Sequence, residues 1–325
     1  MLEKRDSCPG CRSQNYATLL EISYSDPDVF AFLCAYYCHA DPDAIRGRLG
    51  DGALAIAECT VCGLIYQREI PDPDFMRALY ADWIIEGDEL APSSKPMPLD
   101  HYTYLASEVM DLLAEQRLIV GSERRIRVLD FGMGWGAWLQ MARSLGAMVY
   151  GSEISEPKIA HARSIGIPVL TPVQIGAMEF DLICTEQVFE HVPYPAELLQ
   201  SLVASLAPGG YLKISVPPGH AVRATLSRWR WDDAFANQQK LMPVQPLEHI
   251  NCFTSRSLDT LAGKYGLERA AVSPLRAMAL STGWHSVRSA AKNVLRPIYR
   301  FGLKRGTYAV YKRRNQGGPG DLGTR

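Results

Sequence analysis

The sequence has no apolar run approaching the ~20 residues that a membrane span needs, and its first residues carry no apolar core of signal-peptide length. We therefore expect a cytoplasmic protein. Net charge is also nearly absent, since 34 Lys and Arg against 35 Asp and Glu leave −1, so overall charge selects no partner. The 325 residues, 47% of them hydrophobic and 21% charged, suit one large α/β domain with a smaller one.

The charges are nevertheless unevenly placed. Residues 1–100 carry 17 acidic against 8 basic side chains, and residues 284–325 carry 1 against 10. A helix over 284–304 is predicted, with apolar residues at helical spacing and Lys or Arg around the rest of its surface. It is either packed on the core with a solvated basic face or in peripheral contact with an anionic membrane or a phosphorylated substrate. Residues 313–325 are expected to form a disordered tail.

The eight cysteines include two Cys-x-x-Cys pairs. Cys8 with Cys11 and Cys59 with Cys62 can each present two thiolates to one tetrahedral Zn²⁺, whereas the alternative is a set of free thiols. We predict one structural zinc ion held by these four residues. The 47 residues between the pairs exceed the usual ribbon spacing and include a predicted helix near 28–39. The other cysteines are interpreted as small hydrophobic residues: Cys34, Cys38, Cys184 and Cys252.

A glycine-rich segment follows a short apolar run over residues 127–131. Asp130 precedes three glycines at alternate positions, Gly132, Gly134 and Gly136, which predicts a strand, a tight turn and the start of a helix. The spacing differs from the Gly-x-Gly-x-x-Gly of dinucleotide-binding proteins, and the acid before it suits a ligand that carries an ammonium group. The next predicted strand ends at Glu153, a suitable place for a carboxylate that binds ribose hydroxyls.

These residues, with the segments 180–193 and 206–217, resemble the class I S-adenosylmethionine-dependent methyltransferases over roughly residues 125–272. The resemblance implies S-adenosylmethionine as cofactor and a doubly wound, Rossmann-like α/β fold with a seven-stranded sheet. Asp130 would bind the methionyl ammonium group and Glu153 the ribose. The full set of implied cofactor-binding residues is Asp130, Gly132, Gly134, Gly136, Glu153, Glu186 and Gln187.

Alternating strand and helix patterns support a parallel sheet in this region. Strands are predicted near 126–131, 148–153, 168–171, 180–184 and 211–216, and the family would add an antiparallel hairpin from 267–272 and 307–312. The domains are a zinc-ribbon-like module with a helical insertion (1–70), a helical linker and lid (71–125) and the methyltransferase domain (126–312). Insertions interrupt this domain at 219–247 and 274–306. The first is a candidate acceptor lid or, equally, a surface loop with an aromatic cluster.

Two Glu-His pairs, Glu190-His191 and Glu248-His249, are candidates for acceptor chemistry, because histidine is the natural base near neutral pH. Residues 246–254 look like the Glu-His segment of zinc-containing C-methyltransferases that act on nucleotide-linked deoxy-ketosugars, and Tyr80 matches a tyrosine of their active site. The resemblance implies that His249 is the base or orients the acceptor. Glu248 would tune His249, and Tyr80 would help to close the pocket.

A second resemblance competes for the first pair. Some small-RNA end methyltransferases and quinone-ring O-methyltransferases bind a divalent metal through Glu-x-x-Glu-His, which here begins with Gln187. An amide in place of the first carboxylate disfavours a hard cation, so the pair Glu190-His191 is interpreted as structural.

The predicted function is methylation of a hydroxyl or carbon of a small polar metabolite, a sugar or nucleotide-sugar. One alternative is an RNA methyltransferase that uses the zinc module to bind nucleic acid. It is disfavoured because residues 1–100, which include that module, are acidic, whereas phosphate binding needs a basic surface. The other is a non-catalytic binding protein.

Overall fold

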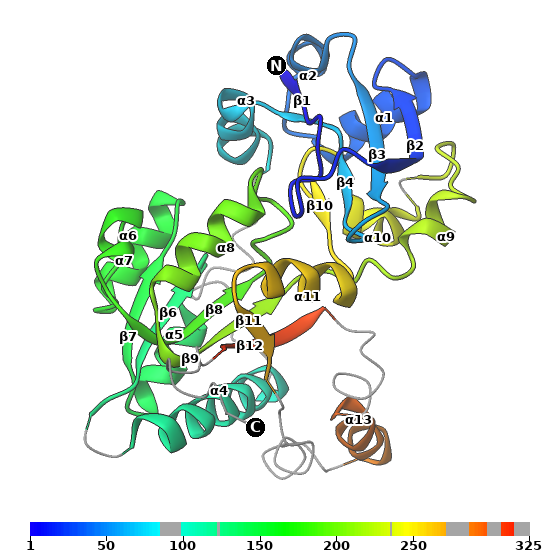
Figure 1. The fold of residues 1–325 in the computed structure, drawn as a ribbon. Coiled ribbons are helices and arrows are strands. Elements are labelled where there is room, and N and C mark those ends of the chain that lie inside the picture. The colour runs from blue at the N-terminus through cyan, green and yellow to red at the C-terminus, as the bar shows by residue number, and fades with distance from the viewer. Residues whose placement is uncertain (85–98, 122–123, 235, 271–285, 298–306, 315–325) are drawn as a thin grey trace, which may run out of the picture.

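The computed structural model describes residues 1–84, 99–121, 124–234, 236–270, 286–297 and 307–314. In this part of the chain the strands form a six-stranded, a four-stranded and a two-stranded sheet. Figure 1 shows the N-terminal strands together at one end of the molecule and the six-stranded sheet at the other.

The six-stranded sheet has the order β11-β12-β9-β8-β6-β7. Its strands are β6 (Arg127–Phe131), β7 (Met148–Ser152), β8 (Phe180–Glu186), β9 (Leu206–Ser215), β11 (Leu267–Arg269) and β12 (Tyr308–Arg313). The strands β9, β8, β6 and β7 are parallel, and β12 runs antiparallel between β9 and β11. The predicted doubly wound α/β sheet with its final hairpin is confirmed. The strand expected near 168–171 is reduced to one parallel bridge, from Val169 to Gly151 beside β7.

Helices cover both faces of this sheet. Consecutive residues of a buried parallel strand point to opposite faces, so apolar side chains on each face need a cover. Val128 packs in one apolar cluster with α4 and α5, and its neighbour Leu129 packs in another with α8 and α11. The helices around the sheet are α4 (Leu99–Val120), α5 (Ala137–Ser144), α6 (Glu156–Ser164), α7 (Pro172–Gly176), α8 (Pro195–Ala204) and α11 (Ser255–Lys264).

The N-terminal module contains the two smaller sheets. Its elements are β1 (Leu2–Lys4), β2 (Tyr16–Ser23), α1 (Pro27–Tyr36), α2 (Pro42–Leu49), β3 (Ala53–Cys59), β4 (Ile65–Gln67) and β5 (Glu69–Pro71), followed by α3 (Pro73–Ala78) and the π-helical turn η1 (Leu79–Trp83). Helices α1, α2 and α3 each begin at an Asp-Pro pair, where the carboxylate caps free backbone N–H groups and proline fits the first turn. The module's helices are thus encoded locally.

A distant segment completes this module. The strand β10 (Asn251–Cys252) pairs antiparallel with β4, which gives the four-stranded order β10-β4-β3-β2. Just before it come α9 (Val222–Leu226), α10 (Gln238–Leu241) and the 3-10 helix η3 (Met242–Val244). Val222, Leu241 and Leu247 share one apolar cluster with Val29 and Phe32 of α1. The insertion at 219–247 therefore packs on the N-terminal module, as Figure 1 also shows.

Helix α13 (Val287–Pro297) lies within the predicted helix 284–304, whose other residues are mostly outside the described part of the chain, as are residues 315–325. None of its described side chains is buried, and Val287 is 89% exposed. Among the described residues, no helix is both long and apolar enough to cross a membrane.

Candidate cofactor and acceptor sites

The glycine-rich turn joins β6 to α5. Gly132 and Gly136 have φ values of 78° and 75°, in the left-handed region that glycine occupies without strain. A Cβ atom on Gly132 would lie 2.5 Å from Val188 Cγ2. The turn therefore packs directly against Val188, in the loop that follows β8. The backbone N–H groups of Gly132 and Met133 donate to the carbonyl of Ser152 at the end of β7. The turn is thereby fixed against both neighbouring strands.

Asp130 is buried within β6, in register with Gly151 of β7 and Cys184 of β8. Burial raises the pKa of its carboxyl to about 7, against the lowering effect of the Lys213 ammonium group, and three further carboxylates raise it. Those carboxylates belong to Glu186, Glu108 and Glu153. Negative groups outnumber positive ones here, so a cationic ligand would stabilise the ionised form of Asp130.

Glu153 lies just beyond the end of β7 and faces the glycine-rich turn. Its Oε2 atom accepts a hydrogen bond from the N–H of Gly134 at 3.0 Å, and its Oε1 atom accepts from the N–H of Ile154 at 2.8 Å. Gln187 follows β8 with a left-handed φ of 53°, and its N–H donates to the carbonyl of Ser215. The predicted cofactor residues thus come together at the carboxyl ends of β6, β7 and β8, where open α/β sheets bind ligands.

A buried lysine next to this site was not anticipated from the sequence. Lys213 of β9 is 1% exposed, and its Nζ lies 2.5 Å from Glu186 Oε2 and 3.4 Å from Glu108. Although burial alone lowers it, these two carboxylates hold the pKa of Lys213 well above its usual value. Trp138 also donates its indole N–H to Glu108. The signal in the sequence is one charged residue in the otherwise uncharged strand 211–216.

The acceptor candidates form a second cluster. The Tyr80 hydroxyl lies 2.7 Å from His191 Nδ1, and the rings of His191 and His249 meet edge to face with centroids 4.7 Å apart. Glu190 Oε1 lies 4.0 Å from His191 Nε2. One ligand atom each of Glu190, His191 and His249 lies within 4.8 Å of the others. Residues from η1, the loop after β8 and the turn before β10 therefore meet at one place.

The orientation of both imidazole rings is set by backbone carbonyls. His191 Nδ1 lies 3.1 Å from the carbonyl oxygen of Glu248, and His249 Nδ1 contacts the carbonyl oxygen of Met242. A carbonyl only accepts, so a proton on Nδ1 of each ring satisfies these contacts and leaves Nε2 as an acceptor. At His191 the Tyr80 oxygen, 2.7 Å from the same Nδ1, would then accept from that proton as well. Burial lowers the pKa of His191 to about 3 and that of His249 to about 4, so both rings are neutral near pH 7.

The two glutamates of this cluster differ in their contacts. Glu190 is 1% exposed, and neither of its carboxylate oxygens has a hydrogen-bond partner among the described residues. Burial raises the pKa of this group to about 8. Glu248 instead accepts a hydrogen bond from the Tyr37 hydroxyl at 3.0 Å, and burial raises its pKa to about 7. Its carboxylate thus contacts Tyr37, the residue that follows α1. Its backbone carbonyl contacts His191. A tuning effect of Glu248 on His249 stays a prediction.

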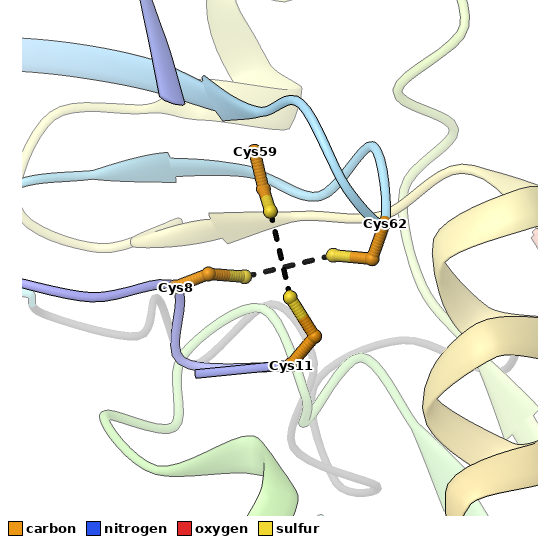
Figure 2. A group of neighbouring side chains, drawn as sticks. All are labelled: Cys8, Cys11, Cys59 and Cys62. Carbon is orange, nitrogen blue, oxygen red and sulfur yellow. Dashed lines mark hydrogen bonds between the residues drawn. The ribbon is translucent and has the colours of Figure 1, made fainter. Parts of the chain in front are cut away.

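The two Cys-x-x-Cys pairs meet in the N-terminal module (Figure 2). The Sγ atoms of Cys8 and Cys62 are 3.6 Å apart, and those of Cys11 and Cys59 are 3.5 Å apart. Four thiolates at ~2.3 Å from a tetrahedral Zn²⁺ would be about 3.8 Å from one another, close to these separations. The hydrogen bond between Cys8 and Cys62 lowers the pKa of the Cys8 thiol and raises that of Cys62. The donor set therefore fits the predicted zinc ion.

Comparison with known proteins identifies the family. The model of a methyltransferase domain family matches residues 99–272, which is more than half of the chain. The chain belongs to this methyltransferase family. The class I methyltransferase family predicted from the glycine-rich segment is therefore confirmed.

Curated relatives of this methyltransferase differ in the atom they methylate. A ubiquinone biosynthesis O-methyltransferase of Caulobacter sp. (strain K31) is 34% identical over 101 residues, 28% of this chain and 40% of that protein. The C-methyltransferase NovU of Streptomyces niveus is 24% identical over 231 residues, 66% of this chain and 46% of its own. The chain spans about half the length of the curated relatives it matches.

A solved structure of the plantazolicin methyltransferase BpumL in complex with SAH is also similar to this chain. It aligns with 16% identity and a TM-score of 0.42, over 74% of this chain and 94% of that chain.

We expect about one zinc ion per chain, because the four thiolates complete one tetrahedral site. Elemental analysis of the purified protein measures this directly. The double variant Cys59→Ser, Cys62→Ser should lose the metal, whereas Cys34→Ser on α1 should keep it. Equal zinc content in the double variant and the wild type would contradict the assignment.

Proposed function

We propose that the protein transfers a methyl group from S-adenosylmethionine to a hydroxyl or carbon of a small polar metabolite, with a sugar or nucleotide-sugar as the expected class. The observation that carries the proposal is the proximity of the two clusters. Val188 packs on Gly132 of the cofactor turn, and its carbonyl accepts the backbone N–H of His191 at 3.0 Å. An acceptor beside His191 would therefore lie within reach of a cofactor bound at the turn.

The cofactor side needs groups for two polar ends of one ligand. When bound, S-adenosylmethionine supplies an electrophilic methyl group on a sulfonium that leaves as a neutral thioether. Asp130 would pair with its ammonium group, and Glu153 would exchange its bond with the Gly134 N–H for the ribose hydroxyls. The carboxylates around Lys213 add negative potential that favours a cationic ligand.

On the acceptor side the chain has to orient a nucleophile and remove its proton. His249 Nε2 is available as the base, because Nδ1 is held by the carbonyl of Met242 and the ring is neutral. Tyr80 and His191 would orient the acceptor next to it, since the Tyr80 hydroxyl contacts His191. Holding donor and acceptor in line contributes much of the rate in such a displacement.

The substrate class is supported by resemblance. Residues 246–254 and Tyr80 look like the active-site segments of zinc-containing sugar C-methyltransferases, and the match to the C-methyltransferase NovU extends over 66% of this chain. An RNA acceptor has less support, because residues 1–100 carry 17 acidic against 8 basic side chains.

A second candidate for the acceptor chemistry is a divalent cation. Glu190, His191 and His249 offer one carboxylate oxygen and one nitrogen from each imidazole within 4.8 Å of one another, a donor set that transition metals accept. The two unpartnered oxygens of Glu190 favour it, since a buried carboxylate usually has a partner. In this alternative His249 would be a ligand and not the base.

Glu153→Ala should weaken S-adenosylmethionine binding by roughly 10- to 100-fold, the equivalent of losing ~1.5–3 kcal/mol from a charge-assisted hydrogen bond. Isothermal calorimetry on the folded variant measures the effect. Glu156→Ala, at an exposed position in the first turn of α6, is the matched control and should bind normally. Wild-type affinity in Glu153→Ala would remove this residue from the site.

Binding of the same ligand should weaken as the pH falls through about 7, because Asp130 becomes protonated below its raised pKa and loses the charge that pairs with an ammonium group. Above that pH the carboxylate is ionised and affinity should level off. Calorimetry over this range, compared with Asp130→Asn, tests the assignment. The variant should bind weakly with little pH dependence, and an unchanged pH profile in it would mean that another group titrates.

His249→Ala should reduce methyl transfer by ~10²–10⁴-fold while leaving cofactor affinity unchanged, since a general base contributes that much to rate and nothing to cofactor binding. Transfer of a labelled methyl group to nucleotide-linked ketosugars measures it. Tyr80→Phe should show a smaller loss, and the exposed His220→Ala should show none. Normal turnover by His249→Ala, with an inactive His191→Ala that only added divalent metal restores, would favour the metal alternative.

A further inference from the structure

The turn that carries His249 is held by a side chain of the N-terminal module. Gln67, at the end of β4, is 1% exposed, and its Nε2 donates to the carbonyl oxygens of Gln245 (2.9 Å) and His249 (3.2 Å). Its Oε1 accepts the N–H of Leu247 at 3.2 Å. Leu247 has a φ of 70°, which is unfavourable for a leucine. One amide therefore satisfies three backbone groups of a strained turn.

A buried arginine reinforces the same region. Arg5 is 7% exposed and donates from Nε and Nη2 to the carbonyl of Gln67, from Nη2 to that of Ile250 at 2.6 Å, and from Nη1 to Asn251 Oδ1 at 2.8 Å. A longer contact of 3.4 Å reaches the carbonyl of Pro193. All of these acceptors are neutral oxygens, and burial lowers the pKa of Arg5 to about 10. A buried guanidinium without a carboxylate is costly for stability, which points to a positional role.

Asn251 passes this constraint to the loop that carries His191. Its Nδ2 donates to the carbonyl oxygens of Phe189 (3.0 Å) and Val192 (2.7 Å), and its backbone N–H donates to the carbonyl of Glu190 at 3.0 Å. Asn251 is completely buried. The loop of His191 is thus attached to Arg5 through Asn251. The turn of His249 is attached to Gln67 directly.

The four cysteines fix where these two side chains lie. Arg5 precedes Cys8 by three residues, and Gln67 follows Cys62 by five. The Sγ atoms of Cys8 and Cys62 are 3.6 Å apart, and the backbone N–H of Arg5 donates to the carbonyl of Arg68 at 2.7 Å. A metal bound by the four thiolates would hold the segment of Arg5 against β4.

We propose that Arg5 and Gln67 are positioning residues through which the zinc-binding module holds His191 and His249 in the geometry that acceptor chemistry requires. The inference rests on the proposed function for its consequence, since only an enzyme needs these rings held in place. The structural coupling from the four cysteines to the two imidazole rings does not depend on which acceptor is methylated. Displacement of a catalytic group by about 1 Å can cost ~10²-fold in rate.

The coupling can be measured without an acceptor by long-range ¹H–¹⁵N NMR of the histidine rings in the full-length protein near pH 7. The chain has seven histidines, and His191→Gln and His249→Gln assign the two signals. In the wild type both rings should show a single tautomer with the proton on Nδ1. Arg5→Met should lose this pattern at both rings, Arg5→Lys should restore part of it, and calorimetric affinity for S-adenosylmethionine should stay within about twofold.

Arg223→Met is the matched control, because Arg223 also joins the 219–247 segment to the module, through an exposed ion pair with Glu58. It should keep the wild-type tautomers. If Arg5→Met does not fold, Asn251→Asp tests the proposal instead. This near-isosteric change removes the two hydrogen bonds that Asn251 Nδ2 donates to the His191 loop, so the His191 signal should change. Removing zinc with a chelator should also disturb both rings while cofactor affinity holds.

Unchanged tautomers in Arg5→Met, in Asn251→Asp or after zinc removal would overturn the proposal. Failure of the proposed function has a different signature. In that case the ring signals respond as expected, but no acceptor is methylated by the wild type. Where an acceptor is found, Arg5→Met should lose ~10²-fold in kcat with little change in the KM for the cofactor.

Discussion

The antiparallel pairing of β10 with β4 joins the N-terminal sheet to the chain that follows β9. It adds Asn251 and Cys252, from the chain that follows the sheet strand β9, to a sheet otherwise made of the first 67 residues. Through this pairing the N-terminal module contacts the segments that carry His191 and His249. The turn that precedes β10 carries His249, and the residue at the end of β4 is Gln67, which binds that turn. The N-terminal module and the methyltransferase domain therefore form one structural unit at this point.

A second constraint is electrostatic. Asp130, Cys184 and Lys213 are consecutive partners across β6, β8 and β9, so their side chains lie on the same face of the sheet. Lys213 neutralises Glu108 and Glu186 in part and leaves Asp130 with a raised pKa. Asp130 and the side chain of Glu108 have little exposure to solvent, and buried carboxylates cost stability unless cations complete the set. A site of this kind is arranged for a positively charged ligand.

Local patterns made the sheet, the glycine turn and the cysteine pairs predictable, because each depends on residues close together in the sequence. Tyr80 and His249 could be named only from resemblance, since 169 positions separate them and nothing local indicates that they meet. His191 was interpreted as structural, yet its ring lies between them. Arg5 and Gln67 gave no signal at all, because a lone polar residue near a strand is usually exposed. Their burial arises only when β10 joins the sheet.

The 47-residue insertion between the two cysteine pairs also acquires a reason in this arrangement. Its helices α1 and α2 supply Val29, Phe32 and Ile45 to the apolar cluster that buries Leu241 and Leu247. Tyr37, just after α1, donates its hydroxyl to the carbonyl of Pro246 and to Glu248. An ordinary short ribbon would offer the thiolates but no apolar surface for the segment before His249. The insertion therefore enlarges the four-cysteine ribbon with an apolar surface on which the turn of His249 packs, and the same surface explains why the segment at 219–247 folds against the module.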